Sequence, residues 1–297
     1  MNETNGSDQA ALEYTLRYNP PMDPVVGERN LKEAKRILDD SNVEFLLGSG
    51  SCLGAIREDG FIEWDDDVDL FVVMGINNVT EESVNTVAEA FREKGYFVSI
   101  EDGAHSRIVM TIKDFMRLSV EFTRITTDDQ INVYPGIKFP AIMFTEPKEI
   151  SFFGEKFLVP NPPEEYLQTK YGSEWMVPKK AGQYEKDVVD NIPSVTLTGS
   201  SCKLRVLDDN EKPVEDAEVN LVNGGRSRTN NLGYAEIILP NPDWYALVIK
   251  YPGHDQVLYM EQLEPGNVYV YRSNSVAEEH DSNIGEIGTL GNLLKIE

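Results

Sequence analysis

Four aspartates, Asp65, Asp66, Asp67 and Asp69, lie within five positions, directly before a run of apolar residues. Like charges placed this close repel one another and raise each other's pKa. A divalent cation removes that penalty, and carboxylate oxygens are the hard ligands that Mg²⁺ and Mn²⁺ prefer. The segment therefore indicates a metal site. The alternative is a solvated acidic turn in an acidic chain.

The apolar residues that follow predict a strand over residues 67–73. Side chains alternate between the two faces of a strand, with a rise of about 3.3 Å per residue. Asp67 and Asp69 are therefore expected on one face, with Val68 and Leu70 on the face that packs into the core. Two carboxylates in this arrangement can converge on one or two divalent cations.

A glycine and serine turn comes before the aspartates. Residues 43–47 predict a short buried strand that runs into Gly50 and Ser51. Glycines let backbone N–H groups approach a phosphate closely, and a helix N-terminus adds a positive dipole. Gly50 and Ser51 are therefore predicted to bind phosphate.

Arg57 lies between this turn and the aspartates, where its guanidinium could contact a phosphate. The alternative for Arg57 is a surface salt bridge with Glu58 or Asp59.

A third carboxylate is expected from a later strand. Glu121 lies within LSVEFTRI, residues 118–125, between Val120 and Phe122. An acid inside such a strand needs a partner, so Glu121 is predicted to be a catalytic residue and a metal ligand. The alternative is a strand residue that faces solvent, and Asp114 is the reserve candidate.

The first part of the chain mixes helices and strands around one sheet. The predicted elements are amphipathic helices over 28–40 and 80–95, strands over 96–100, 107–112 and 118–125, a hairpin over 149–159 and a short helix that ends at Gly172. The sequence pattern then changes to short runs of alternating apolar and polar residues, separated by turns. This pattern predicts a small antiparallel β-sandwich. The predicted divisions are an N-terminal arm 1–27, an α+β domain 28–178, a linker 179–195, the sandwich 196–272 and a C-terminal tail 273–297.

The formal net charge of −24 argues against nonspecific binding to nucleic acid or to an anionic membrane. The sequence holds no apolar run of the roughly 20 residues that a membrane span needs. Its first residues have neither the basic nor the apolar region of a secretion signal. A cytoplasmic protein is therefore expected.

Residues 50–70, GSCLGAIREDGFIEWDDDVDL, resemble the signature of the LicD family, which includes phosphocholine-transferase-like proteins, fukutin and fukutin-related protein. Ser51 stands where that signature has threonine, and Glu63 where it has proline. Residues 150–178 resemble a later segment of the family, in which a hairpin with Phe-Gly is followed by a proline-rich turn, Tyr-Leu, Tyr-Gly and Trp.

This resemblance implies a nucleotidyltransferase-like α+β fold, with a mixed sheet flanked by helices. It also implies a transferase of the EC 2.7 class that moves a phospho-alcohol, such as phosphocholine or ribitol phosphate, from a CDP-alcohol to a hydroxyl of a glycan, lipid-linked or surface-polymer acceptor, with release of CMP. Carried over, Asp67, Asp69 and Glu121 would bind Mg²⁺ or Mn²⁺. Gly50 and Ser51 would bind the phosphates.

Residues 206–239 resemble carboxypeptidase regulatory-like β-sandwich domains, which are transthyretin-like or immunoglobulin-like in fold. Pro213 and Gly233 are expected at turns, and Ala217 and Val219 in the core. No chemistry is predicted in this part.

Two other functions stay open: a nucleotidyltransferase that acts on another small molecule or on a protein, and a catalytically inactive binding protein. Release of CMP would indicate the phospho-alcohol transferase, whereas release of pyrophosphate would indicate the nucleotidyltransferase. The proton of the acceptor hydroxyl is assigned to either Glu121 or Asp66, and the sequence does not choose between them.

Overall fold

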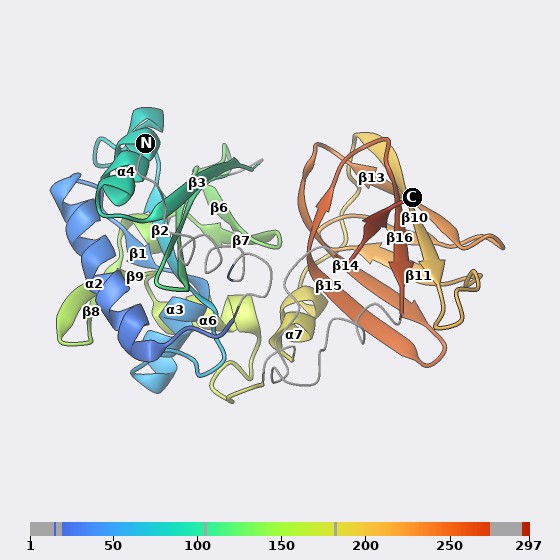
Figure 1. Ribbon diagram of the computed structural model, residues 1–297, viewed down its shortest axis with the longest axis horizontal. Coiled ribbons are helices and arrows are strands. Elements are labelled where there is room, and N and C mark those ends of the chain that lie inside the picture. The colour runs from blue at the N-terminus through green and yellow to red at the C-terminus, as the bar shows by residue number, and fades with distance from the viewer. Residues whose placement is uncertain (1–14, 16–19, 104–105, 181–182, 274–292) are drawn as a thin grey trace. The chain divides into compact units, whose positions relative to one another are not determined.

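The computed structural model describes residue 15 and residues 20–103, 106–180, 183–273 and 293–297 (Figure 1). The chain divides into two units, of which the first comprises residues 1–133 and 138–178 and the second residues 134–137 and 179–297. Each unit is described by itself.

A five-stranded mixed sheet is the framework of the first unit, with the strand order β1-β2-β5-β4-β3. Strands β2 and β5 are parallel, and the other neighbours are antiparallel. The strands are β1 (Leu46–Leu47), β2 (Asp67–Val73), β3 (Phe97–Asp102), β4 (Ser106–Lys113) and β5 (Met116–Thr123). The predicted mixed sheet is therefore confirmed, and the strand predicted over 67–73 has these same bounds.

One face of this sheet is covered by helices α2 (Pro24–Asp40) and α4 (Glu81–Glu93), as Figure 1 shows. Val68, Leu70 and Val72 of β2 are completely buried on that face. The alternation of a strand then directs Asp67 and Asp69 to the opposite face. As predicted, one face of β2 thus packs into the core and the other carries Asp67 and Asp69.

Helix α2 begins earlier than the sequence pattern indicates. Residues up to 27 were predicted to form an arm that prolines keep out of a helix, but Pro24 is the first residue of α2. Asp23 caps the helix, since its carboxylate accepts hydrogen bonds from the N–H groups of Val25 and Val26. Proline suits this first position because its missing N–H would have no partner inside the helix.

A short helix, α3 (Ser49–Leu53), continues into the π-helical turn η1 (Gly54–Glu58) and connects β1 with β2. Two hydrogen bonds fix α3 to β2: the N–H of Gly48 donates to the carbonyl of Asp69 at 2.9 Å, and the N–H of Asp69 donates to Ser51 Oγ at 3.0 Å. The glycine-serine turn is thereby held against the strand that carries the aspartates.

The rest of the first unit contains the predicted hairpin and short helix. The hairpin turns at Gly154, whose φ of +75° suits a glycine. Helix α6 begins at Pro163 and ends before Gly172, as predicted. The elements are β6 (Gln130–Val133), β7 (Ile137–Pro140), α5 (Ile142–Thr145), β8 (Lys148–Phe152), β9 (Glu155–Val159) and α6 (Pro163–Tyr171).

The second unit contains two four-stranded sheets, in the orders β13-β10-β16-β17 and β12-β11-β14-β15, which share one apolar core. Ala217 and Val219 lie in that core, as predicted. Which type of β-sandwich this is stays a prediction. The strands are β10 (Ser200–Leu207), β11 (Glu218–Leu221), β12 (Arg226–Arg228), β13 (Tyr234–Leu239), β14 (Asp243–Tyr251), β15 (His254–Leu263), β16 (Val268–Arg272) and β17 (Lys295–Ile296).

Two segments at the borders of the second unit differ from expectation. The stretch interpreted as a linker contains helix α7 (Tyr184–Asp190), which buries Val188 and Val189. The chain end is not loose over 293–297, because Leu293 and Leu294 are buried and their N–H groups donate to the carboxylate of Glu261. Of the predicted tail, residues 274–292 lie outside the described residues.

Within the described residues, the structure has no helix that combines the length and the apolar character required to cross a membrane.

Gly54 is predicted to be essential for the shape of the α3–η1 segment. A Cβ at Gly54 would lie 2.5 Å from the backbone oxygen of Gly60. Alanine normally stabilises a helix relative to glycine, but here the backbone contact should dominate. We expect Gly54→Ala to lower the free energy of unfolding by about 1–3 kcal/mol, measured by urea denaturation. Gly60→Ala is the matched control, because its Cβ would meet nothing closer than 3.9 Å, and equal losses in both variants would contradict this explanation.

Candidate active site

The parallel pairing of β2 and β5 brings the acidic strand start together with a second row of polar side chains. Asp67 lies opposite Arg117, and Asp69 lies opposite Ser119. Glu121 follows two residues later on β5 and therefore shares their face. Side chains about 50 positions apart in the sequence are thus neighbours on one surface of the sheet.

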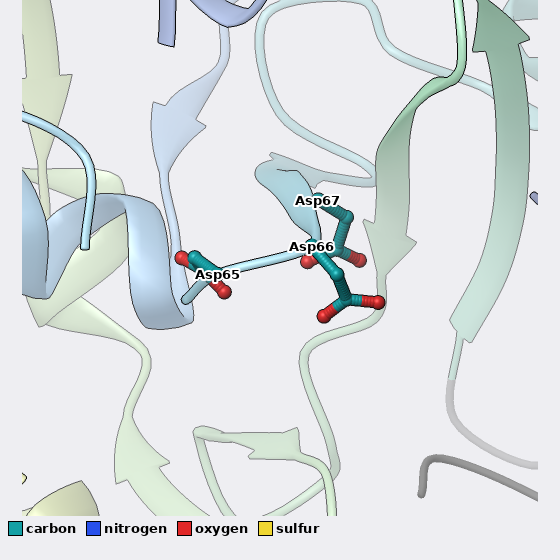
Figure 2. A group of neighbouring side chains, drawn as sticks. All are labelled: Asp65, Asp66 and Asp67. Atoms are coloured by element: carbon teal, nitrogen blue, oxygen red, sulfur yellow. The ribbon is translucent and has the colours of Figure 1, made fainter. Parts of the chain in front are cut away.

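Three of the four aspartates form a compact group of carboxylates. One oxygen each of Asp65, Asp66 and Asp67 lies within 4.8 Å of the others. Figure 2 shows Asp66 and Asp67 close together and Asp65 displaced toward the neighbouring helix. Asp65 lies against α3, where a Cβ at Gly50 would be only 2.6 Å from Asp65 Oδ2. Gly50 therefore makes room for this carboxylate, a role that the sequence did not reveal.

Burial makes these carboxylates difficult to ionise. The pKa values of Asp65 and Asp67 are held well above the usual range, first by burial and then by the charges of neighbouring aspartates. The pKa of Asp66 is raised by burial too, although Arg117 opposes the shift. Asp65 Oδ2 is buried and has no hydrogen-bond partner among the described residues. This part of the site is therefore deficient in positive charge.

Arg117 is a member of the site that sequence reasoning missed. Its guanidinium forms an ion pair with Asp66, and it lies 4.0 Å from Asp67. Both Arg117 and Asp66 are largely buried. The available signal was the arginine at the start of a strand, but its meaning depends on the register between β2 and β5. The role of Asp66 as the base for the acceptor proton stays a prediction.

Asp69 is held in place by two serines. Its Oδ1 accepts a hydrogen bond from Ser119 Oγ at 2.9 Å, and its N–H donates to Ser51 Oγ. The hydroxyl oxygen of Ser51 therefore orients the strand. Phosphate binding by Gly50 and Ser51 stays a prediction.

Glu121 is half-buried on β5. Burial raises its pKa to about 7, the charge of Asp69 adds to this effect, and a hydrogen bond with Ser106 opposes it. A carboxyl with such a pKa can exchange a proton near neutral pH. Neither Glu121 nor Asp69 belongs to the compact carboxylate group, so the roles of both as metal ligands stay predictions. The reserve candidate, Asp114, pairs with Arg29 of α2 and is explained by that contact.

Arg57 pairs with Glu58, the partner that its alternative named, but its own side chain is not at the surface. Its Nε donates to Glu58 at 2.7 Å, and its NH1 group donates to the carbonyl of Trp175 at 2.9 Å. The side chain is only 6% exposed. Arg57 thus connects the end of η1 with the segment after α6, and phosphate contact by Arg57 stays a prediction.

Helix α6 contacts the first residue of α3, beside the glycine-serine turn, through two hydrogen bonds. Tyr166, which is completely buried, accepts a hydrogen bond from the N–H of Ser49 at 3.1 Å. Lys170 Nζ donates to Ser49 Oγ at 2.9 Å. Neither residue was identified as part of the site from the sequence, although both lie in the Tyr-Leu…Tyr-Gly segment that carried the family resemblance.

The ion pair between Arg117 and Asp66 is predicted to stabilise the site. Removing one member of a buried pair leaves the other charge unpaired, so we expect Arg117→Met to cost about 3–5 kcal/mol of folding free energy. Asp66→Asn should cost less, because Asp67 remains beside Arg117. Urea denaturation of both single variants and the double variant measures the coupling, which should lie in the range of about 0.5–3 kcal/mol. Additive effects would show that the pair is not coupled.

Comparison with known proteins supports the family resemblance for part of the chain. Residues 42–162 match the model of the LicD/FKTN/FKRP nucleotidyltransferase domain. Human ribitol-5-phosphate transferase FKTN is 28% identical over 171 residues, which cover 52% of this chain and 34% of that protein. Human ribitol 5-phosphate transferase FKRP is 24% identical over 204 residues, which cover 65% of this chain and 39% of that protein.

The matched regions are short relative to the relatives themselves, since the chain spans between 20% and 39% of the length of the curated relatives that it matches. A solved structure from Thermotoga maritima, described as a nucleotidyltransferase, matches 49% of this chain and 84% of its own, with 17% identity and a TM-score of 0.32.

The stretch matched by the family model contains the glycine-serine turn, the four aspartates and Glu121. The two human relatives are named as transferases of ribitol 5-phosphate. Over residues 42–162 this chain is therefore similar to the LicD/FKTN/FKRP nucleotidyltransferase domain.

Proposed function

We propose that this protein is a metal-dependent transferase that moves a phospho-alcohol from a CDP-alcohol to a hydroxyl of a glycan or of a lipid-linked or surface-polymer precursor. The observation that carries the proposal is the half-buried carboxylate group at the start of β2, beside the glycine-serine turn. The family match of this region supports the class of reaction.

The residues present fit a divalent cation. Carboxylate oxygens from three neighbouring aspartates lie within 4.8 Å of one another, and Asp65 Oδ2 lacks a partner among the described residues. Hard oxygen ligands of this kind suit Mg²⁺ or Mn²⁺. Asp67 and Asp69, which share one face of β2, would hold the ion. When bound, such an ion stabilises the negative charge that develops on the phosphate oxygens.

Group transfer requires one bond to form and one to break. The acceptor oxygen forms a bond with the phosphorus that carries the alcohol, the bridging P–O bond to CMP breaks, and CMP leaves with the electron pair. The hydroxyl proton must pass to a base. We assign that role to Glu121, because its pKa of about 7 lets it accept a proton at neutral pH.

The remaining residues of the site position these groups. Ser119 fixes the Asp69 carboxylate by its hydrogen bond, and Arg117 holds Asp66. The start of α3 is fixed to β2 through Ser51. Because these supports lie on strands and packed helices, the carboxylates are held in place before any substrate binds.

Neutralising Asp67 is predicted to separate stability from function. In buffer with EDTA, Asp67→Asn should raise the melting temperature by a few degrees, because the amide removes both the burial cost and the repulsion from Asp69 and Asp66. We expect Mn²⁺ and a CDP-alcohol to stabilise the wild type, by about 2.7 kcal/mol at a ligand concentration of 100 Kd. The same variant, and Asp69→Asn, should lose this stabilisation. Thermal unfolding with CDP-ribitol and CDP-choline measures this, together with CMP release in the presence of acceptor.

Asp39→Asn on the exposed surface of α2 is the matched control and should respond to metal and donor like the wild type. Release of pyrophosphate from a nucleoside triphosphate would favour a nucleotidyltransferase instead. Metal-dependent binding without turnover would favour an inactive binding protein. A wild type that responds to neither metal nor nucleotide would mean that the aspartates form only an acidic turn.

A further inference from the structure

Lys170 is a buried cation that the proposed mechanism does not use. It lies on α6 with 5% of its surface exposed, which is rare for a lysine because burying an ammonium group is costly unless acidic partners surround it. It also lies beyond residues 42–162, which the family model matches. The position of this charge therefore calls for a reason.

The surroundings of Lys170 belong to the active site. Its Nζ donates to Ser49 Oγ at 2.9 Å, at the start of α3. Burial lowers the pKa of Lys170, while the negative charges of Asp69, Glu121 and Asp67 counteract that shift. The ammonium group thus contacts the glycine-serine turn and interacts electrostatically with carboxylates of β2 and β5.

The two cations that the structure places against these carboxylates have different positions. Arg117 forms an ion pair with Asp66, at the beginning of β2. Lys170 approaches from α6, and one of its contacts is a hydrogen bond to the neutral hydroxyl of Ser49. A neutral acceptor can be exchanged for a phosphate oxygen at little cost, because the new hydrogen bond is charge-assisted and therefore stronger.

We propose that Lys170 binds the diphosphate of the donor, with its ammonium group moving from Ser49 Oγ to a phosphate oxygen. This inference rests on the proposed function and assigns a residue outside the matched domain to substrate binding. It predicts that the charge of Lys170 affects the affinity for the diphosphate more strongly than the affinity for the metal.

The test is isothermal titration calorimetry of the full chain with CDP in the presence of Mn²⁺, and with Mn²⁺ alone. Lys170→Met should weaken CDP binding about 10- to 100-fold, as expected for the loss of a hydrogen bond between charged groups. Mn²⁺ alone should bind Lys170→Met at least as tightly as the wild type, because a cation beside the carboxylates has been removed. A lysine with a merely structural role would weaken both ligands alike, and that outcome would overturn the proposal.

Two further variants locate the effect. Ser49→Ala removes the present acceptor of Lys170, and a direct phosphate contact predicts that this variant binds CDP clearly more tightly than Lys170→Met does. Equal losses would mean that Lys170 acts only through Ser49. Lys156→Met is the control, since Lys156 is an exposed lysine of the same unit that pairs with Glu149 on the β8–β9 hairpin. Its CDP affinity should equal that of the wild type.

Inorganic pyrophosphate separates failure of this inference from failure of the proposed function. A wild type that binds pyrophosphate but not CDP, with loss of pyrophosphate binding in Lys170→Met, would reject the cytidine donor and retain the role of Lys170. Unchanged binding of both probes in Lys170→Met would overturn the role of Lys170 alone. Should Lys170→Met fail to fold by circular dichroism, Lys170→Gln, which keeps a hydrogen-bond donor without the charge, is expected to show the same loss.

Discussion

The burial of several carboxylates at the start of β2 is the constraint on which the first unit depends. Repulsion and desolvation both oppose this arrangement, as the raised pKa values of Asp65 and Asp67 show. The fold tolerates it because the hydrophobic side of the same strand is completely buried against helices, and because Arg117 pairs with Asp66. Hydrophobic burial on one face of the sheet thus offsets the cost of placing carboxylates on the other face.

The glycine-serine turn is shaped by this same concentration of charge. Gly50 leaves space for the Asp65 carboxylate, and Gly54 lets η1 pass the backbone of Gly60. Ser51 connects the turn to β2, and α6 contacts it through Tyr166 and Lys170. Two glycines that the sequence presents as one motif therefore have separate roles, one beside a carboxylate and one at a backbone crossing.

The second unit contributes no catalytic group to this proposal. Its two sheets share a core that the chain end helps to complete, since Leu293 and Leu294 are buried and Glu261 accepts their N–H groups. A buried glutamate is costly unless it is hydrogen-bonded, and here it fixes the last residues of the chain to the sandwich. Leu293 and Leu294 were a weak sequence signal for a buried segment, because two apolar residues do not establish a helical or strand period.

The sequence by itself determined the elements with clear periodicity and the residues with unusual local chemistry. The alternation over residues 67–73 predicted β2 with Asp67 and Asp69 on one face, because strand geometry makes that choice locally. Tertiary structure decided the partners. Arg117 reaches Asp66 only through the parallel register of β2 and β5, and Lys170 reaches Ser49 only because α6 packs beneath α3. Local patterns report what one segment prefers, whereas these contacts join residues 51 to 121 positions apart and depend on how the segments pack.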